Sequence, residues 1–114
     1  FNDCSKDSVA VLTANIKKLG EGEVCTVRTL DYLSCLSALQ GKFDIVFLDP
    51  PYRFDYGVKA AEEIARRKLL SEDGVIVYER DKPFEETVAE SFGLRVADVR
   101  KYGKTYVSFL RKSL

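Results

Sequence analysis

Apolar residues in the first half of the chain follow a helical period twice. They recur every three or four positions at Val9, Leu12, Ile16 and Leu19, and again at Leu30, Leu33, Leu36 and Leu39. This spacing predicts two helices that each turn one face toward a core. Asp3 or Ser5 can cap the first helix, and Gly20 with Gly22 ends it.

Strand patterns stand before, between and after these two helices. The opening residues have the character of the end of a buried strand. Residues 23–28 alternate in polarity, which predicts a further strand. Residues 43–48, "FDIVFL", form a short apolar run of the kind found in strands that are buried on both faces.

The second half predicts two more helices and three more strands. The helical segments are residues 58–70 and 84–92, and the strands are residues 74–78, 93–101 and 105–110. Gly103 and Lys104 suit a tight hairpin turn between the last two strands. The alternation predicts one α/β domain over residues 1–114, with a mostly parallel sheet, helices on both faces and a C-terminal antiparallel hairpin.

Composition excludes several classes of chemistry. The 114 residues carry 18 Lys+Arg and 18 Asp+Glu, so the net charge does not by itself indicate a nucleic-acid binder. Histidine is absent, which excludes Ser-His-Asp and Cys-His nucleophiles and His-containing zinc sites, and we expect no metal. Cys4, Cys25 and Cys35 lack CxxC spacing and are interpreted as reduced thiols of a cytoplasmic protein, and no apolar stretch is long enough to span a membrane.

Three acidic residues follow predicted strands, where ligands of open α/β sheets bind. Asp3 follows the opening strand, Asp31 follows residues 23–28, and Asp49 follows residues 43–48. Their carboxylates could accept hydrogen bonds from ribose hydroxyls or from an adenine amino group. Helix capping and solvation are the alternative roles for each of them. Glu79, at the end of a later strand, is equally open to a role in the same cleft or to solvation.

The tetrapeptide "DPPY", Asp49 to Tyr52, combines features that a simple turn does not require. Pro51 fixes its own φ and pushes Pro50 toward extended geometry, which makes the segment stiff. The Asp49 carboxylate and the Pro50 carbonyl form a pair of acceptors suited to an exocyclic amino group. Tyr52 offers a flat face on which a base can stack.

This tetrapeptide after an apolar strand resembles motif IV of Rossmann-like, S-adenosylmethionine-dependent amino-group methyltransferases. The ordered segments "FNDCSKDSVAVLTANIKKLG", "LDYLSCL", "FDIVFLDPPY", "GVIVYE" and "RKYGKTYVSFLRK" resemble the family that methylates the N2 amino group of a guanine in 16S ribosomal RNA. The resemblance covers essentially the whole chain. It implies a class I methyltransferase sheet, S-adenosyl-L-methionine as cofactor, and ribosomal RNA or a partly assembled small ribosomal subunit as partner.

The resemblance also implies roles for individual positions. Asp3 and Asp31 match the acids that hold the ribose hydroxyls and lie near the adenine amino group, and Asp49 borders the cofactor as well. Asp49, Pro50 and Tyr52 match the residues that grip and stack the target base. Pro51, Tyr52 and Arg53 are expected to contact the substrate.

One departure from the family pattern stands out. The family carries a glycine-rich cofactor loop after its first strand, and no such loop occurs in this sequence, which starts with Phe1 and contains no methionine. We therefore expect a C-terminal two thirds of such an enzyme, with the first strand missing, that binds the cofactor weakly and turns over poorly. A chain trimmed after translation is the alternative.

Other functions fit parts of the pattern. A DNA adenine-N6 methyltransferase could use the same acceptor pair, a nucleotide-binding or protein-interaction module could share the α/β build without catalysis, and a phosphorylation-receiver domain also places acids at strand ends. Arg53, Arg100, Lys101 and Lys104 are candidate phosphate contacts, although surface solvation explains them equally well. A monomer is the expected oligomeric state.

Overall fold

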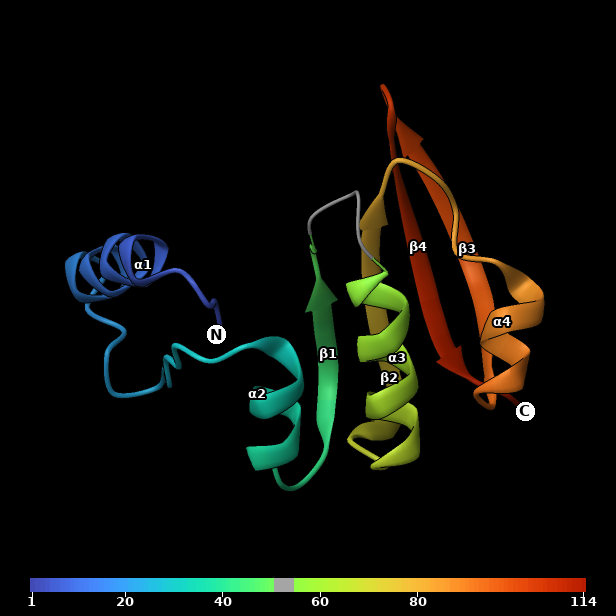
Figure 1. Cartoon of the computed structure of the whole chain (residues 1–114), viewed down its shortest axis with the longest axis horizontal. Coiled ribbons are helices and arrows are strands. Elements are labelled where there is room, and N and C mark those ends of the chain that lie inside the picture. Colours follow the sequence, from blue (N-terminus) through green and yellow to red (C-terminus); the bar gives the residue numbers. More distant parts are fainter. Residues whose placement is uncertain (51–54) are drawn as a thin grey trace. The chain divides into compact units, whose positions relative to one another are not determined.

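The computed structural model describes residues 1–50 and 55–114, and in it the chain forms two units, Phe1–Leu39 and Gln40–Leu114 (Figure 1). The first unit contains α1 (Lys6–Lys18) and α2 (Tyr32–Ala38). The second contains β1 (Phe43–Leu48), α3 (Tyr56–Arg66), β2 (Leu70–Arg80), α4 (Glu86–Ser91), β3 (Leu94–Tyr102) and β4 (Thr105–Lys112). In the described part of the chain, no helix is both long and apolar enough to cross a membrane.

Helix α1 begins and ends where the sequence predicts. The Ser5 hydroxyl accepts a hydrogen bond from the Ser8 amide at 3.3 Å and so caps the first turn. Leu19 closes the last turn, and Gly20 follows with a φ of 75°, a conformation that glycine adopts without strain.

Residues 23–28 do not form the predicted strand. Residues 22–24 form a turn, and only Arg28 pairs in β fashion, through one isolated parallel bridge to Asn2. The Arg28 amide donates to the Phe1 carbonyl at 2.9 Å, and the Asp3 amide donates to the Arg28 carbonyl at 3.2 Å. Because only residues 1–3 run alongside this segment, the ladder stops after one bridge.

The leucine stripe around α2 is less buried than predicted. Cys35 and Leu36 are buried, whereas Leu30 and Leu33 are 37% and 41% exposed. The helix starts at Tyr32 and ends at Ala38, so Leu30 and Leu39 lie outside it. Leu30 instead pairs its backbone with the Asn2 side chain, at 3.0 and 3.2 Å.

The second unit contains a mixed sheet in the order β1-β2-β4-β3. Strands β1 and β2 are parallel, and the predicted hairpin of β3 and β4 is antiparallel and pairs with β2 through β4. Strand β2 starts at Leu70, four residues before the predicted start, and its register to β1 shifts between Phe43 and Ile45. The predicted helix over residues 58–70 is correspondingly shorter, and ends at Arg66.

Helices α3 and α4 cover the same face of this sheet. Ala61 and Ile64 of α3 are buried, and Phe84, just before α4, packs edge-on against Tyr78 of β2 with ring centroids 5.0 Å apart. The Phe84 amide donates to Ser108 Oγ at 3.0 Å, and Ser108 is the cross-strand partner of Tyr78. Helix α4 occupies Glu86–Ser91, less than the predicted residues 84–92.

Candidate functional site

The carboxyl ends of β1 and β2 lie side by side, because the two strands are parallel and Leu48 pairs with Tyr78 (Figure 1). Asp49 and Pro50 follow β1 at this edge, and Glu79 and Arg80 complete β2. Asp49 is exposed and Pro50 is half-buried. Among the residues that the structure describes, Asp49 forms no salt bridge. An exposed carboxylate at this edge is able to accept hydrogen bonds from a ligand. The other predicted substrate contacts, Pro51, Tyr52 and Arg53, lie outside the described residues.

Pro50 packs at a point where the backbone of α3 comes unusually close to β2. A Cβ placed on Gly57, in the first turn of α3, would overlap the ring of Tyr78 and lie 3.0 Å from Pro50 Cγ. Only glycine leaves room for this approach. The residue directly after Asp49 thus lies against the start of α3 and the end of β2.

Arg80 lies at the same edge, on the helix-covered face of the sheet. It is 9% exposed, and its Nη1 lies 3.8 Å from Asp55 Oδ1 and 3.5 Å from Tyr78 Oη. Its Nε lies 3.3 Å from Asp81 Oδ1. The Tyr78 hydroxyl and the Asp81 carboxylate raise the pKa of Arg80, so the guanidinium remains charged. Asp55 directly precedes α3, so Arg80 connects the end of β2 to the start of that helix.

Glu79 points away from this cluster. Successive residues of a strand face opposite sides of the sheet, so the half-buried Glu79 lies on the face opposite Tyr78 and Arg80. The structure brings together Asp49, Pro50, Asp55 and Arg80 at one edge of the second unit.

Asp3 and Asp31 belong to the first unit. Asp3 Oδ1 accepts a hydrogen bond from the Ser5 amide at 2.8 Å and so shapes the turn into α1. The Asn2–Arg28 bridge and the bonds between Asn2 and Leu30 hold residues 1–3 beside residues 28–30. Both acids therefore follow segments that run side by side in the same direction.

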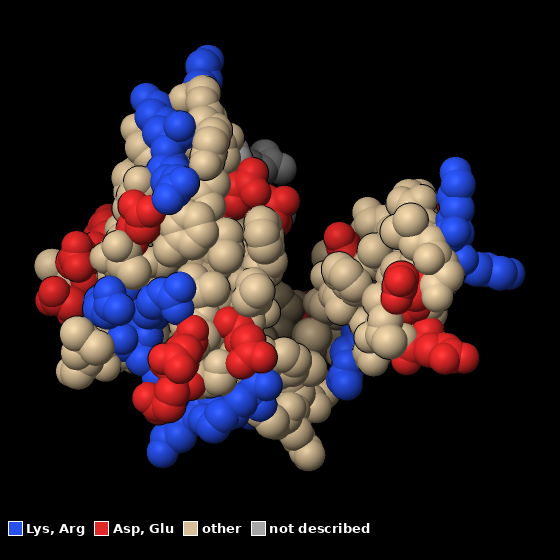
Figure 2. All heavy atoms as spheres, turned by 180° about the vertical axis from the view of Figure 1, so that it is seen from behind, with Lys and Arg blue, Asp and Glu red and all other residues tan. Residues whose placement is uncertain are grey.

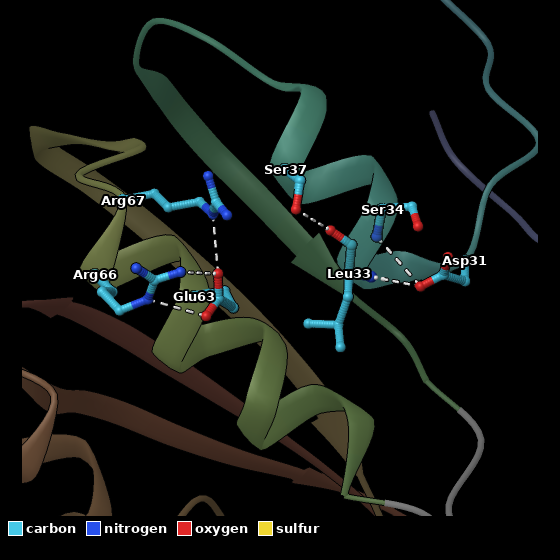
Figure 3. A network of polar contacts seen from close by, with 7 residues as sticks. All are labelled: Asp31, Leu33, Ser34, Ser37, Glu63, Arg66 and Arg67. Atoms are coloured by element: carbon cyan, nitrogen blue, oxygen red, sulfur yellow. Dashed lines mark hydrogen bonds and ion pairs between the residues drawn. The ribbon is translucent and has the colours of Figure 1, made fainter.

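Asp31 is the N-cap of α2 (Figure 3). Its Oδ2 accepts from the amides of Leu33 and Ser34 at 3.1 and 3.2 Å. The Ser34 side chain and these amides lower the pKa of Asp31, so the carboxylate is charged at neutral pH. Oδ1 takes part in neither cap bond. Capping thus explains one oxygen of Asp31 and is compatible with a ligand at the other.

A family model described as conserved hypothetical protein 95 matches residues 1–111. The chain belongs to this family. The match spans both units and nearly the whole sequence, as does the resemblance found in the sequence motifs. No curated protein matches the chain.

Solved structures share the fold of this conserved hypothetical protein 95 member. A conserved hypothetical protein of Streptococcus pyogenes is 26% identical with a TM-score of 0.86, over 97% of this chain and 69% of the other. A Haemophilus influenzae protein proposed to be a methylase is 22% identical with a TM-score of 0.77, over 100% and 71%. The SAH-bound methyltransferase PaMTH1 of Podospora anserina is 17% identical with a TM-score of 0.74, over 99% and 59%. The chain thus has a methyltransferase-type α/β fold.

Sequence reasoning missed Arg80 and Gly57 in this family member. The segment "GVIVYER" ends in two charged residues, and of these only Glu79 was named as a candidate from the sequence. Strand alternation could have shown that Tyr78 and Arg80 share a face. The role of Gly57 depends on how closely a helix approaches a strand, which no local pattern reveals.

Proposed function

We propose that this protein is an S-adenosylmethionine-dependent methyltransferase that acts on the exocyclic N2 amino group of a guanine in 16S ribosomal RNA. The observation that carries the proposal is the exposed Asp49 carboxylate at the carboxyl edge of β1, directly before the packed Pro50. The motif resemblance, the family match and the methyltransferase-type fold support it.

The chemistry requires two acceptors and a flat surface. A guanine amino nitrogen is a poor nucleophile, because its lone pair is delocalised into the ring. The Asp49 carboxylate and the Pro50 carbonyl accept hydrogen bonds from the two amino hydrogens, which pulls the nitrogen toward tetrahedral geometry and exposes its lone pair. Tyr52 stacks on the base after the base has left its helix, and Pro51 and Arg53 border the base and its backbone.

The reaction is an in-line displacement. The cofactor, when bound, supplies an electrophilic methyl group on a sulfonium. The N–CH3 bond forms as the S–CH3 bond breaks, S-adenosylhomocysteine leaves, and the amino proton passes to Asp49 or to water. Asp49 positions the nitrogen and balances its developing positive charge, and no strong base is needed. This agrees with a chain that contains no histidine.

For the cofactor, the proposal assigns a role to each of three carboxylates. Asp3 accepts from the ribose hydroxyls, Asp31 accepts from the adenine amino group through Oδ1, and Asp49 borders the methyl group. The residues fit, because the ribose hydroxyls and the adenine amino group are hydrogen-bond donors and Asp3 and Asp31 are exposed carboxylates that can accept from them. In this proposal the two units act as one domain of a cytoplasmic, monomeric enzyme. The family model supports the single domain because it runs across both units.

The decisive experiment identifies the modified nucleoside. The full-length protein is incubated with S-adenosylmethionine carrying a labelled methyl group and with 16S ribosomal RNA, partly assembled small subunits or DNA, and each product is digested to nucleosides. Labelled N2-methylguanosine from RNA is the expected result. N6-methyladenosine from DNA would identify the rival activity, and unlabelled products with all three substrates would reject methyl transfer.

Asp49→Ala then tests the acceptor. We expect at least a hundredfold loss of methyl transfer with unchanged affinity for S-adenosylhomocysteine, measured by isothermal titration. Asp44→Ala is the matched control, because Asp44 lies near the opposite end of β1 and its Oδ1 accepts from Ser71 Oγ at 2.8 Å. Full activity in Asp49→Ala would remove Asp49 from this role.

A further inference from the structure

The hairpin of β3 and β4 carries an unusual concentration of positive charge. From residue 99 to the end, the chain contains no acidic residue and five basic ones, Arg100, Lys101, Lys104, Arg111 and Lys112. Three of them surround the turn, where Tyr102 is 62% exposed. We call Arg100, Lys101, Tyr102 and Lys104 the basic tip. Figure 2 shows blue side chains gathered over this end of the hairpin.

The pairing of the strands places the basic tip at the carboxyl edge of β1 and β2. Arg80, the last residue of β2, pairs with Tyr106, and the hairpin closes beyond this point at Tyr102 and Thr105. At about 3.3 Å per residue, the turn extends roughly 7 Å past the end of β2. Strand spacing puts β4 about 10 Å from β1 in the plane of the sheet. All these elements belong to the second unit, so the basic tip and Asp49 share one edge.

The side chains of the basic tip are available to a polyanion. Arg100 pairs with Asp98 at 3.1 Å, but the two side chains are 62% and 52% exposed. Such exposed pairs contribute little, because water and salt screen them, and a phosphate can replace the carboxylate. Lys101 lies 5.3 Å from the ring centre of Tyr106, which holds its stem against the strand.

A second cluster of three basic residues lies elsewhere in the second unit and serves as a comparison for the basic tip. Arg66, Arg67 and Lys68 end α3, at the opposite edge of the sheet from Asp49. Glu63 accepts from Arg66 and Arg67 at 2.8 and 2.9 Å (Figure 3). These two arginines hold the pKa of Glu63 at about 2, and Glu63 neutralises one of the three positive charges of this cluster.

We propose that the basic tip binds the phosphates of the RNA strand that enters the site, and that Tyr102 stacks on an unpaired base of that strand. This inference rests on the proposed function, which makes a single RNA strand the substrate at this edge. Three closely spaced cations beside an exposed aromatic ring are typical of single-strand binding surfaces. The offsets of about 10 Å and roughly 7 Å combine to about 12 Å between the turn and the end of β1, which a few nucleotides of a single strand can span.

The test compares two triple variants of the full-length protein that remove the same charge. Arg100→Ala/Lys101→Ala/Lys104→Ala removes the cations of the basic tip, and Arg66→Ala/Arg67→Ala/Lys68→Ala removes those of the cluster at the opposite edge of the sheet. The probe is a fluorescein-labelled, guanine-containing single-stranded RNA of roughly 12 nucleotides, titrated between roughly 50 and 200 mM KCl. Far-UV circular dichroism checks the fold of each variant.

The basic-tip variant should bind about tenfold or more weakly, and the slope of log Kd against log salt should fall by about 2, since three contacts contribute about 0.7 each. The control variant should keep the slope of the wild type. Tyr102→Ala should weaken binding without changing the slope, and Tyr102→Phe should restore it. Equal losses in both triple variants, or a wild type that does not bind the probe, would overturn the proposal.

Methyl transfer by the wild type is measured separately, so the two proposals can fail independently. If RNA is methylated and the two triple variants bind alike, the function stands and the basic tip is only a solvated surface. If no methyl group is transferred to RNA but the basic-tip variant alone loses affinity and slope, the binding surface stands and the proposed reaction fails.

Discussion

Pro50 and Asp55, the residues on either side of positions 51–54, each lie close to a residue at the end of β2 or the start of α3. Pro50 packs near Gly57 and Tyr78, and Asp55 lies 3.8 Å from the guanidinium of Arg80. Pro50 and the end of β2 thus both lie close to Gly57, and Arg80 of β2 pairs with the residue that follows this segment. Since Asp49 directly precedes Pro50, these contacts also limit where the proposed acceptor can move.

Gly57→Ala tests the close approach of α3 to β2. The new Cβ would overlap the Tyr78 ring, which is 2% exposed and cannot move into solvent. We expect the free energy of unfolding to fall by about 1–3 kcal/mol, measured by urea denaturation. Gly22→Ala is the control, because no atom lies within 4 Å of the added Cβ. Equal stability of the two variants would show that α3 shifts to accommodate the methyl group.

Asp55→Asn and Asp81→Asn test whether Asp55 positions the segment beside it or only balances the charge of the Arg80 guanidinium. Both substitutions remove a carboxylate near the guanidinium, at 3.8 and 3.3 Å, but only Asp55 precedes α3 and adjoins positions 51–54. We expect Asp55→Asn to lower kcat for RNA methylation about tenfold without changing cofactor affinity, since small misplacements of reacting groups are costly. Asp81→Asn should leave kcat near the wild-type value. The interpretation fails if the two variants lose activity equally.

At the residue scale, the sequence predicts which exposed side chains carry functional groups better than it predicts which side chains contact each other in the folded chain. The position of Asp49 after a strand and the capping alternative for Asp31 are both readable from neighbouring residues. Arg80 was overlooked because its partner Asp55 lies 25 positions away, and only the folded chain brings them together. The same holds for the packing of Gly57 on Tyr78.

At the scale of elements, α3 ends in a charge cluster that makes stability depend on pH. Arg66 and Arg67 hold the pKa of Glu63 at about 2, below the ordinary 4.5. The ionised Glu63 therefore stabilises the folded state fully above about pH 4.5, and this contribution disappears as pH falls toward about 2. The effect is modest, because Arg66 is 60% exposed and Glu63 is 22% exposed.

Glu63→Gln measures this contribution. The difference in unfolding free energy between wild type and variant should be constant above about pH 5 and shrink to near zero at about pH 2, as measured by urea denaturation at each pH. Glu62→Gln removes the same charge one residue away and should show a smaller dependence on pH. A difference that does not change with pH would mean that the ion pairs contribute nothing to stability.

Most element types were predictable, whereas several boundaries and the strand expected over residues 23–28 were not. Caps and hydrophobic period place α1 and α2, and alternation places β3 and β4. Residues 23–28 have the pattern of a strand, but a strand also needs a neighbour, and only Asn2 provides a bridge. The helical pattern extends to residue 70 and the strand pattern begins at residue 74, yet Lys68 adopts a φ of 56° and β2 begins at Leu70.

At the scale of the molecule, local pattern predicts the α/β class but not the order of the strands. The hairpin signal at Gly103 and Lys104 predicts that β3 and β4 pair with each other. It does not say that β4, the last strand, lies between β2 and β3, which depends on long-range pairing such as that of Tyr78 with Ser108. This arrangement brings the basic tip to the edge that carries Asp49.

Of the carboxylates proposed to bind the cofactor, Asp3 and Asp31 belong to one unit and Asp49 to the other. If the two units form one domain, they should unfold together, and S-adenosylhomocysteine should stabilise both equally. We expect hydrogen exchange in the full-length protein to give one global unfolding free energy for the slowest amides of α1 and of β2. Saturating S-adenosylhomocysteine should raise both values by the same amount, set by its Kd. If the ligand protects β2 but not α1, the carboxylates of the first unit are not part of the cofactor site.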